Sequence, residues 1–141
     1  MRTLIVDDQA MIRTAVRSTL EDCAEIEIVG EALNGQEAIE QTVKLTPDLI
    51  IMDISMPVLD GLSAAERIKE FRPKTRILMF SMHTSKALID IARKLGLSGF
   101  VAKEDDGPAL RSAVGAVLHN KTYFPASDAP QADRVRTGSR W

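Results

Sequence analysis

Residues 49–53 read LIIMD, four consecutive apolar residues followed by an acid. A short, continuous apolar run is typical of a strand that is buried on both faces, as in a parallel sheet. Asp53 stands where that strand would end. The next residues, MPVLDG at 56–61, contain proline and Asp-Gly and therefore predict a turn. The acid is thus expected on a loop at the edge of a sheet.

The same kind of apolar run recurs along the chain and alternates with stretches of helical periodicity. The predicted strands are 3–6, 25–29, 49–52, 77–80 and 100–102, and the predicted helices are 10–20, 34–46, 62–71, 85–95 and 108–118. Strand–helix alternation implies a parallel sheet with right-handed crossovers. We therefore predict an α/β fold of the flavodoxin-like (βα)5 type, a doubly wound five-stranded sheet in the order 2-1-3-4-5.

Composition and length restrict the class of protein. The 141 residues suit one domain, and a net charge of −2 gives no basic field for nucleic acid. Cys23 is the only cysteine, so no internal disulfide is possible. Since no apolar run approaches the roughly 20 residues of a membrane span, we expect a cytoplasmic protein with no membrane contact. Residues 1–124 are predicted as the folded domain and residues 125–141, which contain three arginines, as a flexible tail or linker.

Polar residues follow four of the five predicted strands. They are Asp7 and Asp8, Asp53, Ser81 and Lys103. Because ligands of open parallel sheets bind outside the carboxyl ends of the strands, these side chains should meet at one edge. Asp7 and Asp8 could instead cap the helix that follows them.

The chemistry of these residues favours Mg²⁺ and phosphoryl transfer. Three neighbouring carboxylates repel one another, and a hard divalent cation would relieve the repulsion. Asp8 and Asp53 are predicted as direct ligands and Asp7 as a ligand through water. A carboxylate can act as the nucleophile that forms an aspartyl phosphate, and this role is assigned to Asp53. Lys103 and the Ser81 hydroxyl would bind phosphoryl oxygens.

This set of residues resembles the receiver domain of two-component response regulators. The resemblance implies that Asp53 takes a phosphoryl group from a sensor histidine kinase, in a switch that catalyses its own phosphorylation and dephosphorylation and is not otherwise an enzyme. It further implies that Ser81 and Phe100 move inward on phosphorylation, although Phe100 could also be ordinary core. Ser55 should offer its carbonyl to the metal, and Ser55 and His83 should tune the lifetime of the phosphoryl group.

Two segments, SGFVAK at 98–103 and KTYF at 121–124, are similar to the NarL/FixJ type of regulator, whose output is a LuxR-type helix-turn-helix domain. The resemblance implies control of transcription, with DNA contacted only through an output domain that this chain does not contain. It also implies a possible homodimer.

Three alternatives stay open at this stage. The chain could be a stand-alone receiver that acts through protein–protein interaction. It could be a phosphatase of the haloacid-dehalogenase type, although that class has a second acid two residues after the nucleophile, where Ser55 stands. It could also be an FMN-binding flavodoxin-like protein, although residues 7–10 read DDQA where a phosphate-binding loop is needed.

Overall fold

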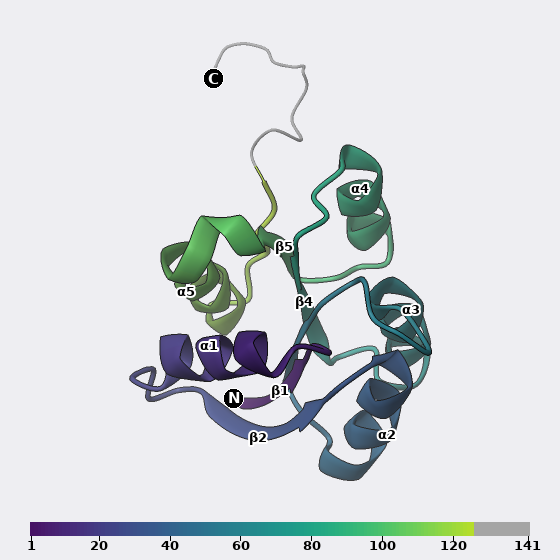
Figure 1. Cartoon of the computed structure of the whole chain (residues 1–141), viewed down its shortest axis with the longest axis horizontal. Helices are drawn as coiled ribbons and strands as arrows, with labels where there is room; N and C mark the ends of the chain where they lie inside the picture. Colours follow the sequence, from purple (N-terminus) through teal and green to yellow (C-terminus); the bar gives the residue numbers. More distant parts are fainter. Residues whose placement is uncertain (126–141) are drawn as a thin grey trace.

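The computed structural model describes residues 1–125 (Figure 1). Of the tail predicted at 125–141, residues 126–141, which include its three arginines, lie outside the described residues. Strands and helices alternate along the described part. They are β1 (Arg2–Val6), α1 (Ala10–Leu20), β2 (Glu27–Ala32), α2 (Gly35–Leu45), β3 (Leu49–Met52), α3 (Gly61–Phe71), β4 (Arg76–Ser81), α4 (Lys86–Lys94), β5 (Gly99–Ala102), a 3-10 turn (Lys103–Asp105) and α5 (Asp106–Leu118). None of the helices in this part of the chain is both long and apolar enough to cross a bilayer.

The five strands form one parallel sheet in the order β2-β1-β3-β4-β5, which confirms the predicted fold. Figure 1 shows α1 and α5 on one side of the sheet and α2, α3 and α4 on the other. β3 lies in the middle, and all four of its residues are buried. Apolar side chains fill both layers, so the continuous apolar run at 49–52 has the two-sided burial that its sequence predicts.

β2 lies further along the chain than the sequence predicts. The predicted strand was 25–29, whereas β2 runs from Glu27 to Ala32. Its pairing with β1 passes from Thr3–Ile28 to Leu4–Gly30, so one residue bulges out. Because β2 is a partly exposed edge strand that contains Gly30 and Glu31, its second half lacks the apolar pattern that marks a buried strand.

The helix ends show local signals that the sequence contains. The side chains of Asn34, Asp60 and Ser85 accept hydrogen bonds from backbone N–H groups in the first turns of α2, α3 and α4. Gly96 has φ +76° and ends α4, as expected for a glycine in the left-handed region. By contrast, α1 begins after Gln9, whose side chain makes no capping bond.

A short segment after α5 covers the outer edge of β5. Tyr123 bridges to Gly99, and its carbonyl accepts a hydrogen bond of 2.8 Å from the N–H of Phe100. A Cβ on Gly99 would lie 2.4 Å from the Tyr123 carbonyl oxygen, so this close approach requires glycine. Phe124 packs on the α2–α4 side of the sheet, with the guanidinium of Arg93 in α4 4.4 Å from its ring. The segment therefore contacts both β5 and α4.

The turn between β3 and α3 contains a strained residue. Val58 has φ +70°, a conformation in which a β-branched side chain crowds its own backbone. Its side chain is 80% exposed, so burial of the side chain offsets little of the conformational free energy that the positive φ costs.

Val58→Gly should therefore stabilise the protein by about 1 kcal/mol, because glycine reaches positive φ without the steric penalty. Thermal unfolding should show a rise of roughly 3–6 °C in the midpoint. Val43→Gly is the control, since Val43 is also exposed but lies within α2, where glycine lowers helix stability. A lower midpoint for Val58→Gly would contradict the assignment of strain to this residue.

Candidate functional site

Three aspartates meet at the carboxyl ends of β1 and β3. Asp7, Asp8 and Asp53 each offer a carboxylate oxygen, and these oxygens lie within 4.8 Å of one another. Asp7 and Asp53 are 2% and 6% exposed, whereas Asp8 is exposed. β1 and β3 are neighbours in the sheet although β2 lies between them in the sequence. The cluster therefore lies at the topological switch point of the sheet.

One oxygen of each buried aspartate is held by the backbone. Asp53 Oδ1 accepts from the N–H of Ile54 at 2.8 Å, and Asp7 Oδ1 accepts from the N–H of Gln9 at 2.9 Å. The N-cap position of α1 is occupied by Gln9, so neither Asp7 nor Asp8 is the capping residue. Both carboxylates instead belong to the cluster. The second oxygen of Asp7 and of Asp53 is directed to a cation.

That cation is Lys103, which begins the turn after β5. Its Nζ lies 2.7 Å from Asp7 Oδ2 and 3.3 Å from Asp53 Oδ2, and its side chain is only 7% exposed. The structure thus brings Lys103 to the cluster, as the sequence predicts. The shorter contact is to Asp7, for which the sequence predicts no contact with Lys103.

The charges in the cluster do not balance. Three carboxylates and one ammonium leave two negative charges. Burial raises the pKa of Asp53 above its ordinary value, Lys103 opposes that rise, and the charge of Asp7 adds to it. The donor set consists of carboxylate oxygens, which suit a hard divalent cation. The residues present therefore fit a metal such as Mg²⁺.

The cluster opens into a pocket of about 340 Å³. The residues that line it are Asp8, Gln9, Ile12, Asp53, Ser55, Met82, His83 and Lys103. Ser55 and His83 are exposed at this pocket. Gln9, Ile12 and Met82 were missed because a polar, an apolar and a sulfur-containing side chain next to the motif carry no distinctive pattern.

Gly61 is a further residue whose role at the site the sequence alone did not show. A Cβ at this position would lie 1.9 Å from the carbonyl oxygen of Asp53. The Gly61 N–H donates to the Ile54 carbonyl at 2.7 Å, which ties the start of α3 to the chain just after Asp53. The Asp-Gly pair at 60–61 is therefore a packing requirement of the acid's own backbone as well as a turn signal.

Ser81 and Phe100 stand apart from the pocket. Ser81 ends β4, is completely buried, and its Oγ accepts a hydrogen bond of 3.0 Å from the N–H of His83. Phe100 is also completely buried and packs in the layer between the sheet and α2–α4. Neither side chain lines the pocket in this conformation.

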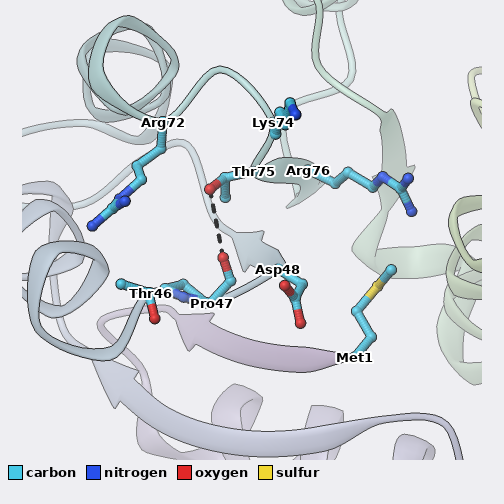
Figure 2. A pocket seen from close by; sticks show the side chains of 8 residues that line it. All are labelled: Met1, Thr46, Pro47, Asp48, Arg72, Lys74, Thr75 and Arg76. Atoms are coloured by element: carbon cyan, nitrogen blue, oxygen red, sulfur yellow. Dashed lines mark hydrogen bonds between the residues drawn. The ribbon is translucent and has the colours of Figure 1, made fainter.

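A second pocket of similar volume, about 340 Å³, lies at the other end of the strands, next to the amino ends of β3 and β4. Figure 2 shows that its cationic side chains diverge: Arg72 and Arg76 point to opposite sides, with Asp48 between them. Arg76 is already bonded to the carbonyl of Val117 and to Asn120. These charges do not converge on one ligand, so the acidic cluster remains the candidate site.

Comparison with known proteins agrees with this geometry. The family model described as the response regulator receiver domain matches residues 3–126. The chain belongs to the response regulator receiver domain family. The resemblance noted in the sequence is therefore confirmed.

Relatives of this receiver have different outputs. It is 45% identical over 105 residues to a protein-glutamate methylesterase/protein-glutamine glutaminase of Methanococcoides burtonii, covering 73% of this chain and 30% of that relative. It is 31% identical to the transcriptional regulatory protein MctR of Rhizobium johnstonii, covering 99% of this chain and 66% of the regulator. The receiver thus spans only about a third of the methylesterase, and the activity in that name is not carried over to it.

Among solved structures, the receiver is similar to a LuxR-family two-component response regulator from Aurantimonas sp. SI85-9A1. The TM-score is 0.84 at 31% identity, covering 90% of this chain and 91% of the other. This similarity supports the predicted NarL/FixJ type, whose output domains are of the LuxR kind.

The raised pKa of Asp53 gives a prediction for the metal-free protein. A carboxyl group with a raised pKa costs folding free energy above that pKa and costs none in acid, below its ordinary value of about 3.9. In EDTA at pH 8, Asp53→Asn should therefore raise the thermal midpoint by a few degrees, and the difference should shrink as the pH falls towards 4.

Asp22→Asn serves as the control of opposite sign. The hydrogen bond and charge of Arg111 lower the pKa of the exposed Asp22, so its replacement should leave the midpoint unchanged or slightly lower at pH 8. A lower midpoint for Asp53→Asn in EDTA would show that the buried carboxylate is stabilising, contrary to the charge arrangement described above.

Proposed function

We propose that the receiver accepts a phosphoryl group on Asp53 from the phosphohistidine of a sensor histidine kinase, with Mg²⁺, and that the modification switches its conformation. The observation that supports this most strongly is the placement of Asp53. It is buried at the end of the central strand, beside the ammonium of Lys103 and two further carboxylates. Family membership supports the same reaction.

In the proposed step, a carboxylate oxygen of Asp53 forms a bond to phosphorus while the P–N bond of the phosphohistidine breaks. The electron pair of that bond stays with the imidazole nitrogen of the donor. The Ile54 N–H fixes one Asp53 oxygen, so the carboxylate presents itself in a defined orientation. Lys103 lies close enough to balance the negative charge that arrives with the phosphoryl oxygens.

Asp8 and Asp53 would hold Mg²⁺ directly, with Asp7 through water and with the Ser55 carbonyl as a further ligand. When bound, the metal supplies a Lewis acid that screens phosphoryl oxygens from the anionic nucleophile. The net charge of the cluster supports this assignment, since a divalent cation would compensate the two uncompensated negative charges.

Ser81 and Phe100 are the proposed switch residues. Ser81 lies at the end of β4 and holds the start of the β4–α4 loop through the His83 N–H, so a change in its hydroxyl partner would move that loop. Phe100 lies one residue from Gly99, where the segment containing Tyr123 joins the sheet. Ser55 and His83, both exposed at the pocket, are proposed to tune the phosphoryl lifetime by controlling access of water.

We further propose that the protein is cytoplasmic. Residues 1–124 would form the receiver, and residues 125–141 would form a linker. The receiver would control transcription through a helix-turn-helix output domain outside this chain. DNA would be contacted only by that output domain. The transcriptional regulator among the relatives supports this organisation. A homodimer is part of the same proposal.

Incubation with acetyl phosphate and Mg²⁺ should add one phosphoryl group to the protein, and Asp53→Asn should abolish the addition. Intact-mass spectrometry under conditions that preserve acyl phosphates would measure it. Asp48→Asn is the matched control, because Asp48 lies at the opposite edge of the sheet and should leave labelling unchanged. Equal labelling of Asp53→Asn would exclude Asp53 as the acceptor.

Lys103→Ala should weaken beryllofluoride binding by at least tenfold while leaving Mg²⁺ affinity equal to or tighter than that of the wild type. The ammonium is proposed to bind the phosphoryl group, but it also competes with a metal for the oxygens of Asp7 and Asp53. Titration calorimetry with Mg²⁺, followed by fluorine NMR of the beryllofluoride complex, would separate the two effects. A parallel loss of Mg²⁺ affinity would contradict this role.

A further inference from the structure

Asp8 differs from the other two aspartates in how it is held. The carboxylates of Asp7 and Asp53 each accept a backbone N–H and face Lys103. Asp8 is exposed, and no hydrogen bond within residues 1–125 orients its carboxylate. The backbone of the β1–α1 turn, including the peptide that joins Asp7 to Asp8, therefore sets the position from which this carboxylate reaches the cluster.

Arg13 holds that peptide. It lies in α1, and its Nη1 donates to the carbonyl oxygen of Asp7 at 2.7 Å. Its Nε donates to Glu31 Oε1 on β2 at 2.8 Å, and its side chain is 14% exposed. One planar guanidinium thus connects the turn that contains the acids to the edge strand beside it. A charge-assisted bond from a rigid, largely buried group fixes the carbonyl more firmly than water would.

We propose that Arg13 is a positioning residue of the metal site, which sets the direction of Asp8 through the Asp7 carbonyl. This inference rests on the proposed metal-dependent function. Removal of a group that orients a metal ligand without touching the metal commonly weakens metal binding by about 10–100-fold. Arg13 meets the description because it touches neither the pocket nor a carboxylate of the cluster.

The chain offers a matched control in Arg17. It lies one turn further along α1, and its Nε contacts the other oxygen of the same Glu31 at 2.5 Å. Arg17 donates to Glu31 and not to the β1–α1 turn, so removal of Arg17 weakens the link between α1 and β2 without releasing the Asp7 carbonyl. A role confined to packing α1 on the sheet would be lost in both variants.

The experiment compares Arg13→Met, Arg13→Lys and Arg17→Met with the wild type by calorimetric titration with Mg²⁺. Arg13→Met and Arg13→Lys should each weaken Mg²⁺ binding by about 10–100-fold, because neither side chain can bond the Asp7 carbonyl and Glu31 with the geometry of a guanidinium. Arg17→Met should stay within about twofold of the wild type. In the metal-free proteins, the amide NMR signal of Asp8 should shift in both Arg13 variants and stay in place in Arg17→Met.

Two results would overturn the inference. Tighter Mg²⁺ binding in Arg13→Met with wild-type affinity in Arg13→Lys would show that Arg13 acts only as a nearby positive charge. Wild-type affinity and an unchanged Asp8 signal in folded Arg13→Lys would show that the contact positions nothing. In both cases the wild type still binds Mg²⁺ and the proposed function stands. Absence of Mg²⁺ binding by the wild type would instead refute the proposed function, and the inference with it.

Discussion

The contact of Lys103 with Asp7 and Asp53 is the interaction on which the site depends. It draws together the ends of β1, β3 and β5, three strands that are far apart in the sequence. β4 lies between β3 and β5, so a short side chain at position 103 could not reach the two acids. The buried ammonium compensates part of the charge of two nearly buried carboxylates, and a buried acid without such a partner would be costly. The sheet order and the cluster are therefore two aspects of one arrangement.

Most of the fold could be predicted from the sequence because its strands are buried on both faces. Runs such as residues 49–52 are apolar throughout, and the side chains after them fall at the carboxyl edge by topology alone. The predicted bounds of β2 were wrong because an edge strand with a bulge between Ile28 and Gly30 does not need a continuous apolar run. The three aspartates and Lys103 were predicted because each directly follows an apolar run, which can be recognised in the sequence without knowing any distance.

What the sequence could not show are contacts that depend on tertiary geometry. Lys103 Nζ lies 2.7 Å from Asp7 and 3.3 Å from Asp53, a difference that no sequence pattern encodes. Gly61 was visible as a turn residue, but its approach to the Asp53 carbonyl appears only once α3 is placed. Arg13 and Glu31 are 18 residues apart, and the strand predicted at 25–29 did not include Glu31. The hydrogen bond from Arg13 to Asp7 follows from the placement of Glu31 beside α1.

The region around Asp53 combines several features that lower stability. The pKa of Asp53 is raised by burial, the cluster carries excess negative charge, and Val58 in the following turn has a strained backbone. Sites that must change state are commonly held in such unfavourable arrangements by a rigid surround. Here that surround is the fully buried β3 and the backbone bonds of Ile54 and Gly61. The cation and the covalently bound group that we propose at Asp53 would therefore alter the balance of charge at the site without disturbing the strand that supports it.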